Sequence, residues 1–184
     1  PKEIKLQEHR IGLTPESVKV LVERNHEVLV ENNGGLEAGF TNEDYLKAGA
    51  KIINTPEEIF KKAELIVKVK EPQLNEVNMI REGQIIYTYL HLAAAKELTL
   101  GLMNSKSICI AYETVTDDDG RLPLLAPMSA VAGRMSIQAG AHCLEKNQKG
   151  RGLLIGGAPG VESANVVILG GGVVGENAAI IATG

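Results

Sequence analysis

The segment from Val166 to Gly184 reads VVILGGGVVGENAAIIATG. Its β-branched start predicts a strand, which we extend back over NVVIL, its glycines predict a turn, and its alanine-rich end predicts a helix. Gly170, Gly172 and Gly175 have the G-x-G-x-x-G spacing of a dinucleotide-binding turn. Because such a turn joins the first strand of a doubly wound sheet to its crossover helix, this segment decides the fold class.

Each glycine has an expected task in this turn. Gly170 permits the tight turn, Gly172 lets the backbone approach a pyrophosphate, and Gly175 allows close packing of helix on strand. The helix begins near Val173 and Val174, where unpaired N–H groups and the positive end of the helix dipole attract phosphate. A glycine-rich loop without a ligand is the alternative, and the flanking strand and helix favour nucleotide binding. The acidic residue that contacts the ribose is expected beyond Gly184, so residues 1–184 do not distinguish NAD from NADP.

The preceding chain alternates helical and β-rich patterns. Thr14 and Pro15 predict one helix start, and Thr55, Pro56 and Glu58 predict another. Further helices are expected over 74–81, ending before a glycine at position 83, and over 94–104. Strands are expected over 28–30, 65–69, 84–90 and 107–112. Alternation of this kind with nearly continuous apolar strands indicates an α/β fold with a buried, Rossmann-like parallel sheet.

The stretch DDDGRLPLLAP at 117–127 interrupts the alternation, because its glycine and its two prolines disfavour regular structure. A long helix is expected after it, with Ser129 as its N-cap. We therefore predict a substrate-binding α/β domain over 1–127, a connecting helix over 128–148, and the beginning of an NAD-binding Rossmann domain over 149–184. Only about two helical turns follow the glycine turn, so we expect this last domain to be truncated.

Ionisable residues follow three of the expected strands: Lys70, His91 and Glu113. The carboxyl ends of parallel strands share one sheet edge, where α/β proteins bind ligands. Arg10 precedes the first helix. Taken singly, Lys70 and Arg10 could be surface charges, His91 a packing residue, and Glu113 a helix cap or a solvent-exposed group. Together they suit a small carboxylate substrate, which arginine and lysine would bind while histidine exchanges a proton.

Composition excludes several classes of protein. The net charge of −4 disfavours nucleic-acid binding, and no apolar run is long enough to span a bilayer. Cys109 and Cys143 lie far apart in apolar stretches, so we expect small buried side chains and a reducing, cytoplasmic location. The histidines outside the expected strand end form no spaced cluster, so no metal site is predicted; they are His9, His26 and His142.

Longer blocks carry a family resemblance. HRIGLTPESV, GGLEAGFTNEDYLKAGA, LIVKVKEP, YLHLA, AYETV and LPLLAPMSAVAGRMSIQAGA, together with VVILGGGVVG, resemble the N-terminal half of alanine dehydrogenases. The NAD(H)-binding subunit of proton-translocating transhydrogenase is similar in architecture, but it resembles this chain less around YLHLA and LPLLAPMS.

The resemblance implies roles for individual residues. Arg10 and Lys70 would bind the substrate carboxylate and carbonyl, and His91 would be the catalytic acid and base. Ser129 would contact the cofactor, and Val173 and Val174 would lie over its pyrophosphate. Met128 and Tyr89 would line the cleft. The chain departs from the family pattern at Ala130, where a glutamate is usual, and this change could alter local packing or cofactor approach.

The implied reaction is the reversible oxidative deamination of L-alanine by NAD⁺ to pyruvate, ammonia and NADH, through an imine that water attacks. An assisting aspartate and the ribose-binding acid are expected in a second half, so this portion alone is expected to be inactive. The complete enzyme would be a homo-hexamer without nucleic-acid or membrane partners. Two alternatives stay open: the transhydrogenase subunit, and a non-catalytic nucleotide-binding module, against which Arg10, Lys70 and His91 argue.

Overall fold

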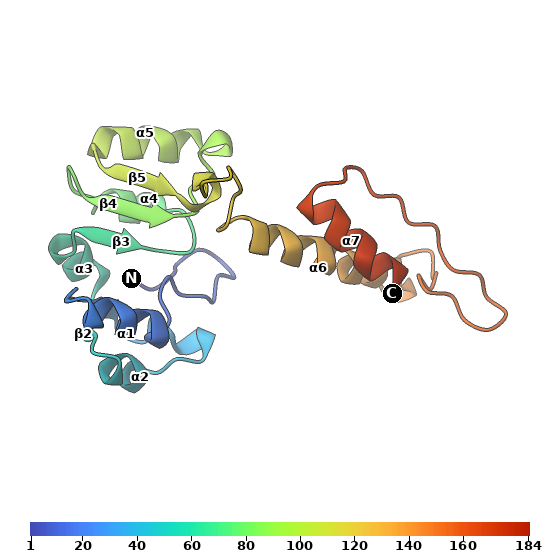
Figure 1. Cartoon of the computed structure of the whole chain (residues 1–184), viewed down its shortest axis with the longest axis horizontal. Helices are drawn as coiled ribbons and strands as arrows, with labels where there is room; N and C mark the ends of the chain where they lie inside the picture. The colour runs from blue at the N-terminus through green and yellow to red at the C-terminus, as the bar shows by residue number, and fades with distance from the viewer. The chain divides into compact units, whose positions relative to one another are not determined.

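The computed structural model describes residues 1–184, which divide into two compact units, Pro1–Val115 and Thr116–Gly184 (Figure 1). The division precedes the boundary expected at residue 127. The long helix expected to connect two domains belongs to the second unit.

Local capping signals start the helices of the first unit. Helix α1 (Pro15–Glu23) begins after Thr14, whose side chain accepts a hydrogen bond from the backbone N–H of Ser17. Helix α3 (Pro56–Lys62) begins in the same way after Thr55. Both starts confirm the prediction from sequence, since a threonine cap followed by proline satisfies or removes an unpaired N–H group. Helix α2 (Asn42–Lys47), which was not predicted, has a full capping box.

The strands of this unit are parallel, as predicted, but they form two sheets. Strands β1 (Leu29–Glu31) and β2 (Lys51–Ile53) make one sheet. Strands β3 (Leu65–Val67), β4 (Ile85–Thr88) and β5 (Ile108–Ala111) make the other, in the order β3-β4-β5. A groove of about 590 Å³ is lined by residues from both sheets, including Leu29 of β1 and Leu65 of β3. The residue pattern of a strand does not specify its neighbours, so neither this division nor β2 was predicted.

The remaining helices of this unit are short, except one. They are α4 (Leu74–Val77), α5 (Lys96–Ser105) and the 3₁₀ helices η1 (Leu36–Ala38), η2 (Leu92–Ala94) and η3 (Tyr112–Thr114). The helix expected over 74–81 was too long. The backbone N–H of Arg81 donates to the Gln84 side chain at 3.1 Å instead of continuing the helical pattern.

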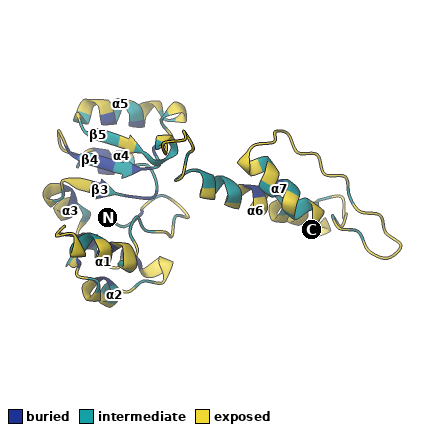
Figure 2. Ribbon diagram, in the orientation of Figure 1, coloured by how far each residue is buried: buried dark blue, intermediate teal, exposed yellow.

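Each sheet has its own apolar core (Figure 2). Around the three-stranded sheet it comprises Ile59, Phe60, Ile66, Val77, Ile80, Ile86, Leu90, Leu98 and Leu102. Around the two-stranded sheet it comprises Val18, Val28, Val30, Tyr45 and Ala50. Burial of a side chain of this size contributes about 1.5–3 kcal/mol, so these two clusters are the main source of stability in the first unit.

The second unit consists of two packed helices and the long connection between them. Helix α6 (Ala126–Leu144) lies against α7 (Val173–Thr183), and η4 (Lys146–Gln148) follows α6 (Figure 1). The contact depends on Gly133, since a Cβ there would overlap the Val174 carbonyl oxygen. The prediction of Ser129 as N-cap was wrong. Pro127 lies in the first turn of α6, and the Ser129 N–H already donates to Leu125 at 3.0 Å.

Two further predictions about this unit were wrong. NVVIL at 165–169 is not a strand, because a strand is defined by hydrogen bonds to a neighbour and the second unit contains no other strand. Its Val167 and Leu169 are 82% and 94% exposed. Cys143 is exposed, because α7 covers only one side of α6, whereas Cys109 is half-buried. None of the helices is both long and apolar enough to cross a bilayer.

Candidate functional site

The N-terminal segment passes the carboxyl end of β3 and brings its charged residues to that sheet edge. The Glu3 carboxylate accepts a hydrogen bond from the backbone N–H of Val69 at 2.6 Å. Gly12 lies so close to the same strand that a Cβ there would be 2.7 Å from the Val67 carbonyl oxygen. A side chain at position 12 would therefore push the segment carrying Arg10 away from the edge.

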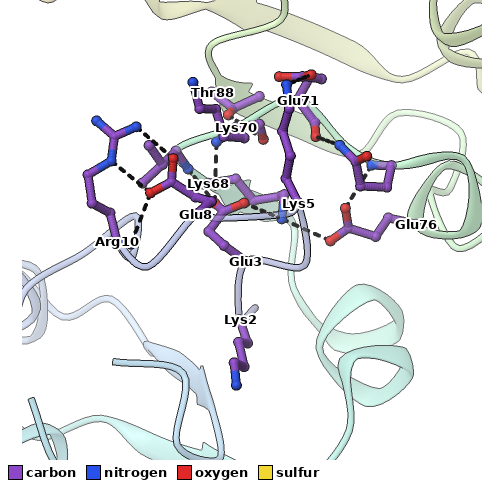
Figure 3. A network of polar contacts seen from close by, with 12 residues as sticks. Lys2, Glu3, Lys5, Glu8, Arg10, Lys68, Lys70, Glu71, Glu76 and Thr88 are labelled. Atoms are coloured by element: carbon purple, nitrogen blue, oxygen red, sulfur yellow. Dashed lines mark hydrogen bonds and ion pairs between the residues drawn. The ribbon is translucent and has the colours of Figure 1, made fainter. Parts of the chain in front are cut away.

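A buried ionic cluster stands behind this edge (Figure 3). The Lys68 Nζ lies 3.0 Å from the Glu3 carboxylate and 2.9 Å from that of Glu76, and all three side chains are almost fully buried. The second Glu76 oxygen accepts a hydrogen bond from the Gln73 N–H at 2.8 Å. Buried charges are tolerated only when paired and hydrogen-bonded, so this cluster ties β3, α4 and the N-terminal segment together.

Lys70 follows this cluster by two residues. Its backbone N–H donates to Glu3 at 3.3 Å, and its carbonyl oxygen accepts from the Thr88 hydroxyl at 2.9 Å (Figure 3). The backbone of Lys70 is thereby fixed both to the N-terminal segment and to β4, while its side chain is half-buried.

Arg10 is held by Glu8. The Arg10 Nε and Nη2 donate to the two Glu8 carboxylate oxygens at 2.8 and 2.6 Å, and the Arg10 backbone N–H donates at 3.0 Å. Hydrogen bonding by the guanidinium lowers the pKa of Glu8 from 4.5 to about 2, and the Glu8 carboxylate in turn raises the pKa of Arg10. The Glu8 side chain is 7% exposed and that of Arg10 is 45% exposed. The guanidinium is thus oriented by a nearly buried carboxylate while it stays accessible to solvent.

His91 follows β4 in a left-handed backbone conformation, with φ of 49° and ψ of 37°. The Glu113 carboxylate accepts from the backbone N–H of His91 at 2.7 Å and from that of Leu90 at 3.1 Å. Burial acts to raise the pKa of Glu113, but these backbone hydrogen bonds outweigh it, so the pKa is lowered. Glu113 therefore holds the backbone just before η2, which carries the exposed His91 side chain.

Aromatic rings lie near both Arg10 and His91 at this edge. The Tyr89 ring stacks on the His91 ring, with centroids 6.0 Å apart and planes 11° apart. Tyr112 packs edge-on against Tyr89 at 5.0 Å and against Tyr87 at 4.3 Å. Burial raises the pKa of Tyr112 and that of Tyr89, and the Arg10 charge partly offsets the second effect. Tyr89 thus lies within electrostatic reach of Arg10 and in contact with His91.

The arrangement places two cations and a titratable imidazole at one edge of the three-stranded sheet. We call the set of Arg10, Lys70, His91, Glu8 and Glu113 the charged edge. Arginine and lysine bind carboxylates, and imidazole exchanges protons near neutral pH, so the edge is suited to a small acid that gains or loses a proton. Glu8 was missed from the sequence, where its only signal is the spacing E-x-R; Lys68 was missed because it precedes Lys70 in an apolar strand.

The second unit holds the glycine turn. Gly170 has φ of 101°, a left-handed conformation that side chains disfavour. A Cβ at Gly175 would overlap the Gly170 carbonyl oxygen, so only glycine permits the helix to approach the turn this closely. A Cβ at Gly172 would meet no atom within 4 Å. The open space at Gly172 is what close approach of a pyrophosphate to the backbone would require.

The residues predicted to bind the cofactor surround one cavity of about 1090 Å³ in the second unit. Its lining includes Ser129, Gly170, Gly172, Val173, Val174 and Gly175. Helix α7 starts at this cavity, and its N-cap Gly172 supplies no side-chain hydrogen bond to the first turn. The first N–H groups of a helix lack partners within the helix, so they are suited to bind a phosphate. The glycines and the start of α7 are features that suit binding of a dinucleotide pyrophosphate. Met128 is not among the residues that line this cavity.

The chain matches two family models over nearly its whole length. Residues 1–132 match "Alanine dehydrogenase/PNT, N-terminal domain", and residues 136–184 match "Alanine dehydrogenase/PNT, C-terminal domain". It is 55% identical over 184 residues to an alanine dehydrogenase of Halomonas elongata and 54% identical to one of Methanococcus maripaludis. All of this chain aligns with 50% and 49% of those proteins, so it spans about half the length of these curated relatives.

Solved structures show the same relationship. An L-alanine dehydrogenase superposes with a TM-score of 0.90 at 52% identity, over 100% of this chain and 50% of that one. A transhydrogenase from Sinorhizobium meliloti superposes with a TM-score of 0.77 at 24% identity, over 99% of this chain and 52% of that one. The second likeness shows a shared fold and no more.

Proposed function

The chain belongs to the alanine dehydrogenase/PNT family, and on that premise we propose that the full-length protein is an NAD-dependent alanine dehydrogenase. The single observation that carries the proposal is the charged edge, where Arg10, Lys70 and His91 lie together. A module that only binds nucleotides has no use for these residues. Identities above 50% to proteins named alanine dehydrogenase support the same choice.

Arg10 and Lys70 bind the substrate in this proposal. The Arg10 guanidinium, held by Glu8, hydrogen-bonds the carboxylate of alanine or pyruvate, because its planar donors match a carboxylate. The Lys70 ammonium adds a second positive charge near the carboxylate and the carbonyl oxygen. Its backbone ties to Glu3 and Thr88 keep its position constant relative to β3 and β4.

His91 moves the proton. During deamination it accepts a proton from the water that attacks the imine, and in the reverse direction it returns that proton. Glu113 positions the His91 backbone, and the Tyr89 ring restricts the imidazole on one face. An aspartate that assists this step in the family is expected outside residues 1–184.

The glycine turn of the second unit would bind the cofactor. Bound NAD⁺ supplies the hydride acceptor. Gly170 and Gly175 would shape the turn, Gly172 would let the backbone approach the pyrophosphate, the N–H groups at Val173 and Val174 would donate to it, and Ser129 would contact it from α6. A homo-hexameric assembly, inferred from the family, and a cytoplasmic location, inferred from cysteine usage, belong to the same proposal.

Steady-state kinetics tests this function. The full-length protein should form NADH from NAD⁺ in the presence of L-alanine, and it should consume NADH when given pyruvate and ammonium. Dependence on alanine would contradict a transhydrogenase subunit, which exchanges hydride between two nicotinamide nucleotides. NADH binding without any turnover of alanine or pyruvate would instead support a non-catalytic module.

A further inference from the structure

Glu8 is an acidic side chain at an edge proposed to bind an acid. Its carboxylate hydrogen-bonds Arg10 through two guanidinium nitrogens and one backbone N–H, and it is almost buried. A negative charge beside Arg10, the cation proposed to bind the substrate carboxylate, weakens the attraction of this edge for any anion. The Glu8 carboxylate therefore has one of two roles. It only orients the Arg10 guanidinium, or it also discriminates between the anions that bind there.

The charges along this edge nearly cancel. Arg10 and Lys70 are two cations, and Glu8 and Glu113 are two carboxylates whose pKa values are both lowered. Lys70 is near enough to contribute to the lowered pKa of Glu8. These four side chains therefore carry no net charge before a substrate carboxylate binds.

No uncompensated cation stands nearby for a second carboxylate. Behind the edge, Lys68 lies between the carboxylates of Glu3 and Glu76. Lys5 is paired with Glu71. A dicarboxylate would therefore bring an unpaired negative charge toward Glu8, and desolvating such a charge is costly. Specificity of this kind comes from repulsion of the wrong ligand.

Resting on the proposed function, we propose that the Glu8 carboxylate is a specificity-determining group that restricts the site to monocarboxylic 2-oxo and 2-amino acids. Its hydrogen bonds keep the guanidinium in place for one carboxylate, and its charge opposes a second. A purely orienting Glu8 would treat mono- and dicarboxylates alike, and this difference makes the proposal testable.

The experiment compares two inhibitors that differ only by one carboxylate. Propionate and malonate are assayed against pyruvate in the full-length protein with NADH and ammonium. The wild type should bind malonate no more tightly than propionate. In Glu8→Gln, which keeps a hydrogen-bond acceptor but loses the charge, the ratio of malonate affinity to propionate affinity should rise about tenfold, a difference of about 1.4 kcal/mol.

Two further variants separate charge from geometry. Glu8→Asp keeps the charge, so its inhibitor ratio should equal that of the wild type. Glu58→Gln removes one negative charge from an exposed pair with Lys62 on α3 and should also leave the ratio unchanged. Equal weakening of both inhibitors in Glu8→Gln would overturn the proposal, and so would the same shift in Glu8→Asp.

The wild-type measurement is decisive even if Glu8→Gln does not fold, which its melting temperature would reveal. Tighter binding of malonate than of propionate by the wild type contradicts the proposal directly. Absence of pyruvate turnover in the wild type would contradict the proposed function instead, so the two failures are distinguishable.

Discussion

At the charged edge of the first unit, position is set by pairs of side chains, whereas at the glycine turn of the second unit it is set by the backbone. Arg10 is oriented by Glu8, and the backbone of His91 is held by Glu113. In the turn, the position of the backbone depends on residues that have no side chain, Gly170 and Gly175. Groups that react must project at fixed places, while a phosphate chain needs bare N–H groups. The two regions should therefore respond to different substitutions.

The strongest test of this contrast is His91→Asn. Asparagine tolerates the left-handed backbone but cannot act as an acid or base near neutral pH. We expect kcat to fall by about 10²–10⁴-fold, the usual contribution of a general acid–base group, with the NADH dissociation constant nearly unchanged. Stopped-flow turnover and NADH fluorescence measure the two quantities. Activity equal to the wild type would remove His91 from the proton transfer.

The next effect concerns stability. Lys68→Met leaves the carboxylates of Glu3 and Glu76 buried without their cation, so the free energy of unfolding should fall by about 3–5 kcal/mol. The matched control is Lys62→Met, which breaks only the exposed pair with Glu58 and should cost about 0–1 kcal/mol. Urea denaturation of both variants measures the difference. Similar losses in the two would show that burial does not distinguish the pairs.

A third test addresses the turn, and it uses two adjacent glycines that both have room for a Cβ. Neither Gly171 nor Gly172 would bring a Cβ within 4 Å of another atom, so alanine should leave the fold unchanged at both. Only Gly172 is expected to face the pyrophosphate. Gly172→Ala should weaken NADH binding about tenfold, or about 1.4 kcal/mol, and Gly171→Ala by much less. Equal affinities would argue against the expected approach of the cofactor.

The smallest effect is expected from Arg10→Lys, which keeps the charge at the edge but loses the planar fork. The KM for pyruvate should rise about fivefold, because lysine cannot hydrogen-bond Glu8 and the substrate carboxylate with the same paired geometry. The value of kcat should change less. An unaltered KM would exclude Arg10 from substrate binding.

Much of the fold could be predicted because its signals are local. Thr14 with Pro15, and Thr55 with Pro56, identify helix starts within a few residues. The prediction of a strand over NVVIL was wrong for the opposite reason. Its composition suits a strand, but a strand forms only when it is hydrogen-bonded to a neighbouring strand. The start of α6 was misplaced because proline is as acceptable in the first turn of a helix as it is in a loop.

The residues of the candidate site likewise differ in whether a local sequence pattern identifies them. Lys70, His91 and Glu113 could be chosen from sequence because each follows a strand, and the parallel register brings strand ends together. Glu8 and Lys68 could not, because their importance comes from partners. Lys68 pairs with Glu3, which lies 65 positions earlier in the chain, and no local pattern reports such a pairing.

The left-handed backbone at His91 has a consequence for how this protein can evolve. Apart from glycine and asparagine, residues in that conformation lose roughly 1–2 kcal/mol relative to an ordinary one. Glycine or asparagine at position 91 would therefore give a more stable fold, but it would remove the group proposed to transfer the proton. In the proposed function, the stability of the fold and the activity thus favour different residues at this position.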